Sequence, residues 1–171
     1  KYTMILRLRM LSDENDNFVR DFEVSHEMNL FELHNFIITS IGYDDCMASF
    51  YTADEQWTPI QEFSQMDLGD EQFEGAPIAM EKVTLAELVV SECNRLIYQF
   101  DMIADRAFYL EVVSATQPNP ELEYPRVSFE NARVPDQYDP DAVPADDGSI
   151  FDEIMDEFGE FDGDDSYDDE Y

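Results

Sequence analysis

The distribution of charge along the chain limits which residues can form a hydrophobic core. Residues 134–171 contain no Lys, Arg or His but 16 of the 41 Asp and Glu residues, so they supply half of the formal net charge of −32. In residues 1–133, nine basic residues face the other 25 acidic ones. Because a dense run of like charges opposes compaction, we expect a weakly acidic folded body followed by a strongly acidic tail.

Length and charge also restrict the partners. A chain of 171 residues accommodates one domain and an appendage. Nine scattered basic residues form no stripe for phosphate groups, so we expect no direct nucleic-acid binding and no membrane association. No apolar run approaches the roughly 20 residues of a membrane helix. Cys46 and Cys93 are expected to be free thiols in a reducing cytoplasm rather than a disulfide.

Runs of apolar, aromatic and β-branched residues predict five strands and a sixth, shorter one. They cover residues 2–11, 18–24, 47–53, 58–63, 95–101 and 107–114. The first two are separated by a polar turn and are expected to pair as an antiparallel hairpin. The short strand falls within residues 54–75, an acidic and irregular excursion that holds Trp57.

Two helices are predicted from capping residues and apolar spacing. Asn29 and Glu32 form a capping-box pattern at the start of a helix over residues 29–41, and Gly42 is suited to end it. A shorter helix over residues 84–92 starts with Thr84 and Glu87 in the same pattern. The first helix carries an apolar stripe of Leu30, Leu33, Ile37 and Ile41.

This order of elements predicts an α+β fold. We expect a mixed or antiparallel sheet with one main helix and a second short helix, in a β-grasp-like arrangement of two layers. Residues 1–115 form the predicted body. Residues 116–148, which hold most of the prolines, are expected to form an extended connector, and residues 149–171 the acidic tail.

The tail contains a segment that could recognise a partner. Its apolar residues recur at helical spacing among acidic ones, so an induced helix would have one apolar and one acidic face. Alternatively, this face docks on the body, or the tail only keeps the protein soluble. The residues of the predicted partner-binding segment are Ile150, Phe151, Ile154, Met155, Phe158 and Phe161.

The sequence contains no pattern typical of catalysis. His26 and His34 make no zinc spacing with two distant cysteines, and the six glycines form no phosphate-binding loop. A pair of His34 and Cys46 is conceivable, but its spacing does not single it out. We therefore expect a protein that is not an enzyme and that has neither a metal nor a cofactor.

Residues 29–45, NLFELHNFIITSIGYDD, resemble the motif TLxxLHxxIQxAMGWxD of the Ri-plasmid open-reading-frame-three-like family, also described as TnpR-type insertion-element passenger proteins. Weaker similarity follows around Leu85, Tyr98, Tyr124 and residues 132–136. The resemblance implies a compact α+β domain, often carried on mobile elements, with no established biochemical role. The matching residues, which we expect to be structural, are Leu30, Leu33, His34, Ile37, Ile41, Gly42, Tyr43 and Asp45.

The chain departs from the family pattern in two places. The family's FGDxWxH stretch has no counterpart after Phe100, and Val127 and Val134 stand near positions where the family has cysteines. If the family uses those groups for a ligand or a metal, the resemblance implies that this chain lacks them.

Three functional hypotheses are compatible with the sequence. The first is a non-enzymatic protein-interaction module that uses the tail. The second is an acidic DNA mimic, whose carboxylates imitate phosphates and occupy a DNA-binding protein. The third is a cryptic enzyme with a site around His34, Tyr43 and Cys46.

Overall fold

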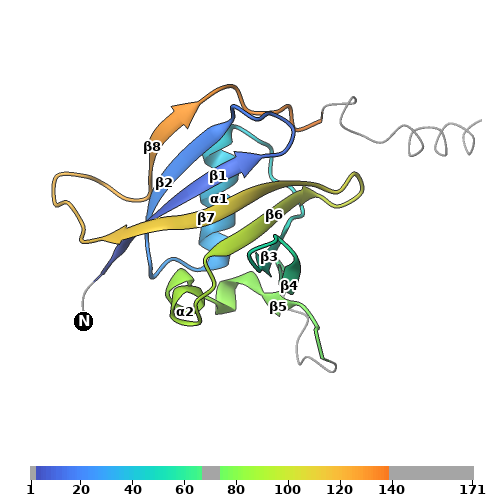
Figure 1. Cartoon of the computed structure of the whole chain (residues 1–171), viewed down its shortest axis with the longest axis horizontal. Coiled ribbons are helices and arrows are strands. Elements are labelled where there is room, and N and C mark those ends of the chain that lie inside the picture. Colours follow the sequence, from blue (N-terminus) through green and yellow to red (C-terminus); the bar gives the residue numbers. More distant parts are fainter. Residues whose placement is uncertain (1–2, 67–73, 139–171) are drawn as a thin grey trace, which may run out of the picture. The chain divides into compact units, whose positions relative to one another are not determined.

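The computed structural model describes residues 3–66 and 74–138, in which one sheet packs against a main helix (Figure 1). The described residues up to Gln137 form one compact unit. The predicted amphipathic segment, residues 150–161, lies outside the described residues.

Eight strands form a single sheet in the order β5-β4-β3-β6-β7-β1-β2-β8. Every pairing in it is antiparallel except the short one between β4 and β5. The strands are β1 (Ile5–Ser12), β2 (Val19–Ser25), β3 (Ser49–Ala53), β4 (Pro59–Ser64), β5 (Ile78–Ala79), β6 (Arg95–Asp101), β7 (Arg106–Thr116) and β8 (Arg126–Asn131).

The main helix, α1 (Leu30–Ile41), begins and ends with the predicted capping groups. The Asn29 side chain accepts a hydrogen bond from the Glu32 amide, and the Glu32 carboxylate accepts one from the Asn29 amide. Gly42 ends the helix in the left-handed region at φ +78°, where a side chain would be strained. The apolar stripe is buried against the sheet.

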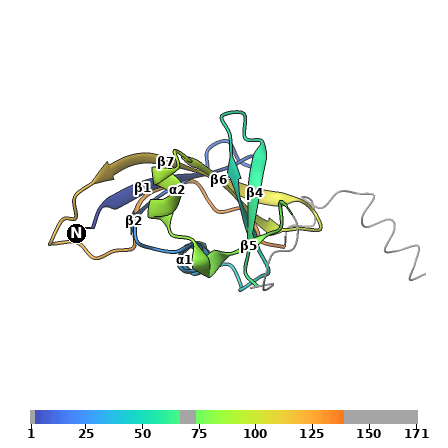
Figure 2. The ribbon, with the colours of Figure 1, turned by 90° about the horizontal axis from the view of Figure 1, so that it is seen from below.

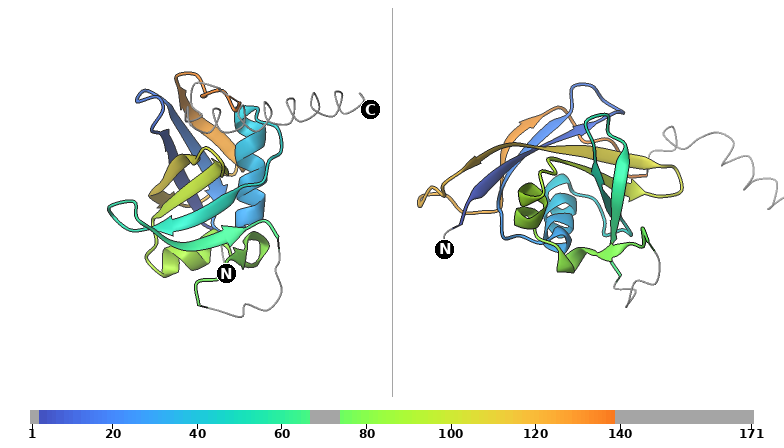
Figure 3. Two further views of the ribbon diagram at one scale, coloured as in Figure 1. Left: turned by 90° about the vertical axis from the view of Figure 1, so that its right-hand side faces the viewer. Right: turned by 60° about the horizontal axis from the view of Figure 1, so that its bottom comes forward.

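A 3₁₀ turn, η1 (Met80–Lys82), precedes the short helix α2 (Leu85–Val90), whose first turn is capped by Thr84. Figure 2 and the right-hand view of Figure 3 show α1 and α2 on the same side of the sheet, which arches over them. Leu85 and Leu88 pack into the main core with Leu8 and Leu110 of the sheet. Both helices therefore cover one face of the sheet.

An ion network around one buried carboxylate lies on the opposite face of the sheet. Asp21 of β2 is fully buried and accepts hydrogen bonds from Arg7 and Arg9 of β1 at 2.7–3.0 Å. Burial alone would raise the pKa of Asp21, but the two guanidinium groups outweigh it and lower the pKa. The network therefore keeps a carboxylate ionised between two strands.

The predicted α+β class with a mixed sheet, one main helix and one short helix is confirmed, whereas the β-grasp-like detail is not. The structure also has strands that the sequence did not predict. Strand β8 lies within residues 116–148 and pairs with β2. Val127 and Phe129 alternate with polar residues in it, Val127 packs against the core and Arg126 pairs with Glu23. This short pattern stands in a proline-rich stretch, and pairing with the free edge of β2 completes the strand.

Candidate functional site

The family motif brings His34 against Tyr98 of β6. Both side chains are fully buried, and His34 Nδ1 lies 2.7 Å from the Tyr98 hydroxyl. His34 Nε2 lies 3.4 Å from Asp45 Oδ1, which is within ion-pair range but does not have the geometry of a hydrogen bond. The Asp45 side chain is 80% exposed. The pair therefore joins α1 to β6, and one carboxylate lies over its outer end.

Burial shifts the pKa values of this group toward the neutral forms of its side chains. Burial lowers the pKa of His34, and the opposing effect of Asp45 is smaller. Burial raises the pKa of the Cys46 thiol, and the Asp45 carboxylate adds to that rise. Burial likewise raises the pKa of Tyr98. A reactive cysteine needs a lowered pKa and access to solvent, whereas Cys46 is half-buried and favours its neutral form. We call His34, Asp45, Cys46 and Tyr98 the motif cluster.

The loop after α1 also holds the end of the described chain. The Tyr43 hydroxyl donates a hydrogen bond to the Pro135 carbonyl at 2.6 Å. The Gln137 side chain accepts one from the Asp44 amide at 2.7 Å and donates one to the Asp44 carbonyl at 3.0 Å. Residues 135–137 are thus fixed against the C-terminal end of α1.

Arg106 at the start of β7 completes this attachment. It is 3% exposed, and it donates to both carboxylate oxygens of Glu14 at 2.9 and 3.0 Å. It also donates to the carbonyls of Asp136 and Gln137, each at 2.7 Å. Its guanidinium lies 4.9 Å from the Phe100 ring centroid. One buried cation therefore satisfies acceptors from two distant parts of the chain, at residue 14 and at residues 136–137.

The structure places the remaining motif residues in packing positions. Leu30, Leu33 and Ile37 are fully buried, and Ile41 and Tyr43 are partly buried against the core. Cys46 and Cys93 are both free thiols, and they come from different parts of the body. The motif cluster brings together two of the three residues in the cryptic-enzyme hypothesis, His34 and Cys46, beside Tyr98.

An open groove lies between the β3–β4 hairpin and the C-terminal end of α2. It has a volume of about 850 Å³. The turn of the hairpin and the turn after α2 each include a non-glycine residue in the left-handed region, Trp57 at φ 64° and Glu92 at φ 65°. We call it the acidic groove, and its lining includes Ala53, Asp54, Glu55, Ile60, Phe63, Leu88, Glu92, Cys93, Asn94, Arg95 and Glu111.

Arg95 is the one basic side chain that lines the acidic groove, and its charge is already engaged. It donates to the Glu55 carbonyl, and its Nη2 lies 3.6 Å from Glu111 Oε2. Its guanidinium is 4.8 Å from the Trp57 ring centroid. The Glu55 and Glu92 carboxylates, in contrast, have no ion pair or hydrogen bond with another residue that the structure describes. The groove therefore has an excess of negative charge.

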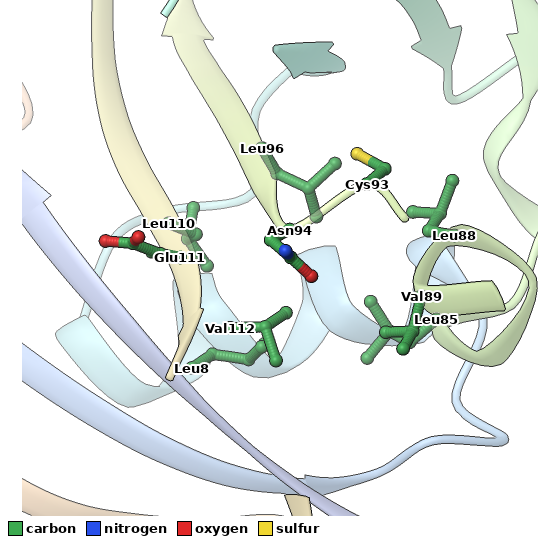
Figure 4. Close-up of a pocket in the computed structure, with 10 residues that line it drawn as sticks. All are labelled: Leu8, Leu85, Leu88, Val89, Cys93, Asn94, Leu96, Leu110, Glu111 and Val112. Carbon is green, nitrogen blue, oxygen red and sulfur yellow. The ribbon is translucent and has the colours of Figure 1, made fainter. Parts of the chain in front are cut away.

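A small apolar pit adjoins the acidic groove. The two share Leu88, Cys93, Asn94 and Glu111. Figure 4 shows leucine and valine side chains converging on the pit from α2, β6, β7 and β1, while the Glu111 carboxylate points away. Its volume of about 10 Å³ is close to that of one water-sized probe. The pit is a packing gap under α2 and is too small for a ligand of its own.

Sequence reasoning did not find the acidic groove or the role of Arg106. The groove residues come from five separate segments, and only the acidic, irregular stretch around Trp57 pointed toward it. In residues 3–66 and 74–138, no three His, Cys, Asp or Glu side chains are close enough to hold a metal ion. No helix in the same residues has the length and apolarity to cross a bilayer.

The sequence profile of the plasmid pRiA4b ORF-3-like proteins matches residues 4–140, so the chain belongs to this family. The fold of this chain is similar to that of a protein of unknown function, MM3350, from Methanosarcina mazei Go1, as seen in its crystal structure. The similarity has a TM-score of 0.66 at 16% sequence identity, and it covers 80% of this chain and 75% of the other. A comparison with curated proteins finds no match. These comparisons therefore show the family and the fold, and they do not show an activity.

Proposed function

We propose that this chain is a non-enzymatic protein-interaction module whose acidic groove receives part of a partner protein. The observation that carries the proposal is the open groove itself, in which Glu55 and Glu92 have no ion pair with a described residue. Binding sites are concave and combine apolar walls with a few available polar groups. The groove has both, with Phe63 and Leu88 below its acidic rims.

The motif cluster supports the non-enzymatic part of the proposal. Its histidine and tyrosine are sealed from solvent, and its thiol favours the neutral form. A general base or nucleophile must reach its substrate and must have a pKa suited to its task. His34, Tyr98 and Cys46 do not meet both conditions, so we assign the motif cluster to folding. The free, half-buried thiols fit a reducing compartment, and we propose the cytoplasm.

The acidic tail is a second contact in this proposal. The predicted segment of residues 150–161 would add an apolar face to whatever the groove holds. Its alternative role is only to add negative charge, which speeds the encounter with a basic partner. These two roles differ in whether the tail changes the lifetime of the complex or only its rate of formation.

A pull-down from a lysate of the source organism tests the proposal. The baits are the intact chain, a chain ending at Ser149 and a Glu55→Gln/Glu92→Gln variant, each washed at low and high salt. We expect a specific protein that the groove variant loses. Equal recovery by all three baits would contradict both contacts, and turnover of a small molecule by the purified chain would contradict a non-enzymatic role.

The DNA-mimic hypothesis is the second candidate, favoured by the net charge of −32. Phosphate-like carboxylates would occupy the basic cleft of a DNA-binding protein, and a mobile-element setting would supply such a protein. Its binding must weaken steeply with salt, as phosphate binding does. Displacement of the captured protein by duplex DNA, with no loss in the groove variant, would favour mimicry over the groove.

A further inference from the structure

We infer that the occupant of the acidic groove is an extended, lysine- or arginine-bearing segment of a partner protein, anchored by a small aliphatic side chain. This inference rests on the proposed function, because it names the chemistry of the partner at that same site. It is carried by the charges around the groove, the end of α2 and the composition of the groove floor.

The charged residues that line the acidic groove favour a positively charged ligand. Asp54 and Glu55 face the groove from the hairpin, Glu92 from the turn after α2 and Glu111 from β7. Arg95 is their one counter-charge among the lining residues, and it is engaged by Glu111, the Glu55 carbonyl and Trp57. The Asp54 carboxylate accepts hydrogen bonds within its own turn.

Glu55 and Glu92 therefore remain available, and they stand on opposite rims. Neither has an ion pair with a described residue, and both are exposed. A lysine or arginine that enters the groove would meet an exposed carboxylate on each rim that is not already paired with a described residue. Charge-assisted hydrogen bonds of this kind are stronger than neutral ones.

The end of α2 adds to the negative potential. Its C-cap, Ser91, lines the groove, and no basic residue lies in its last turn. The last carbonyl groups of a helix carry a partial negative charge that favours nearby cations. The effect is small for so short a helix, but it has the same sign as the carboxylates.

The floor of the groove favours an aliphatic anchor. Ala53, Phe63 and Leu88 are buried there, while Ile60 on the wall is 68% exposed and offers apolar area to a ligand. The adjoining pit is only about 10 Å³ and accepts no side chain of a ligand, so the apolar contact is made with Ile60 and the floor. A valine or alanine between basic residues would supply this contact.

Three capped hexapeptides test the inference on the intact chain. The first alternates lysine with valine, the second lysine with glycine, and the third glutamate with valine. Calorimetry measures affinity, and maleimide labelling of Cys93 in a Cys46→Ala background reports occupancy of the floor. We expect the lysine–valine peptide to bind best and to slow labelling of Cys93, which is half-buried in the groove.

Two double variants separate the groove from the general charge of the chain. Glu55→Gln/Glu92→Gln should weaken binding of the lysine–valine peptide about three- to tenfold, since each exposed pair is worth up to about 1 kcal/mol. Glu121→Gln/Glu123→Gln removes the same charge from exposed residues between β7 and β8. This control variant should change the affinity for the lysine–valine peptide less than twofold. Equal weakening by the two variants, or equal binding of lysine–glycine and lysine–valine peptides, would overturn the inference.

The peptide and lysate experiments fail in different ways. If the groove variant loses a cellular partner but the lysine–valine peptide does not protect Cys93, the proposed function stands and the inferred occupant is wrong. If the peptide protects Cys93 but no partner depends on Glu55 and Glu92, the groove binds cations and the proposed function is wrong.

Discussion

The motif cluster and the acidic groove both gather ionisable side chains from a helix and several strands, but solvent reaches only one of them. In the motif cluster, His34 Nδ1 and the Tyr98 hydroxyl are hydrogen-bonded to each other inside the core. In the acidic groove, Glu55 and Glu92 face solvent without an ion pair to a described residue. Burial turns polar groups into structural links, because an unpaired buried group is costly. Exposure leaves them available for a partner.

The residues that define the family are therefore different from those that we propose to bind a partner. The residues that match the family motif lie in α1 and its C-terminal loop, where they pack the core and hold residues 135–137. The groove residues lie outside that motif, in the hairpin, the turn after α2 and two strands. Substitutions should therefore affect stability at the first site and binding at the second.

The largest effect is expected for Arg106→Met. The variant removes a guanidinium that is 3% exposed and leaves the Glu14 carboxylate and the carbonyls of Asp136 and Gln137 without their donor. We expect the free energy of unfolding to fall by about 3 kcal/mol, the lower end for breaking a buried pair, since Glu14 retains some exposure. Urea unfolding measures this, and a loss below about 1 kcal/mol would contradict it.

Tyr43→Phe should lower the free energy of unfolding less than Arg106→Met, because it removes one hydrogen bond and little volume. The hydroxyl that donates to the Pro135 carbonyl is lost, and we expect a destabilisation of about 1–2 kcal/mol. Tyr51→Phe is the control, because this half-buried tyrosine of β3 interacts with the partly buried Glu62 side chain and not with a backbone carbonyl, and it should cost less. Equal unfolding midpoints for the two variants would show that the bond to Pro135 contributes nothing.

The pH dependence of stability should show the burial of His34. Because burial lowers its pKa below the ordinary value of 6.5, the unfolded chain binds the proton more readily than the folded one. The contribution of His34 is therefore fully present above pH 6.5 and is lost as the pH falls from 6.5 toward the folded pKa. Urea titrations between pH 5 and 8 should give a flatter profile for His34→Gln, and identical slopes would contradict a buried neutral imidazole.

The smallest effect on stability is expected in the groove. Glu55→Gln/Glu92→Gln removes two exposed carboxylates, so the free energy of unfolding should change by less than about 0.5 kcal/mol. Thermal and urea unfolding against the unmodified chain measure this. A loss above about 1 kcal/mol would mean that these carboxylates support the fold, and the contrast with the motif cluster would then disappear.

Much of the fold could be predicted from local patterns. The capping box of Asn29 and Glu32, the stop at Gly42 and the hairpin of the first two strands all involve neighbours in the chain. Strand β8 could not be predicted in this way, because it depends on the edge of β2, a hundred residues earlier. The same limit hid the groove, whose rims come from residues about 40 positions apart, such as Glu55 and Glu92.

Periodicity, capping and charge along the chain were enough to predict the α+β class, the placement of α1 and the acidic excess, and the motif of residues 29–45 was enough to suggest the family. Which polar residues are buried and which are exposed became clear from the packing of the folded body alone. His34 and Glu92 are both polar residues in or near helices, yet one lies in the core and the other on a rim. Solvent access depends on the packing of distant segments, and it sets both the pKa of a group and its freedom to bind.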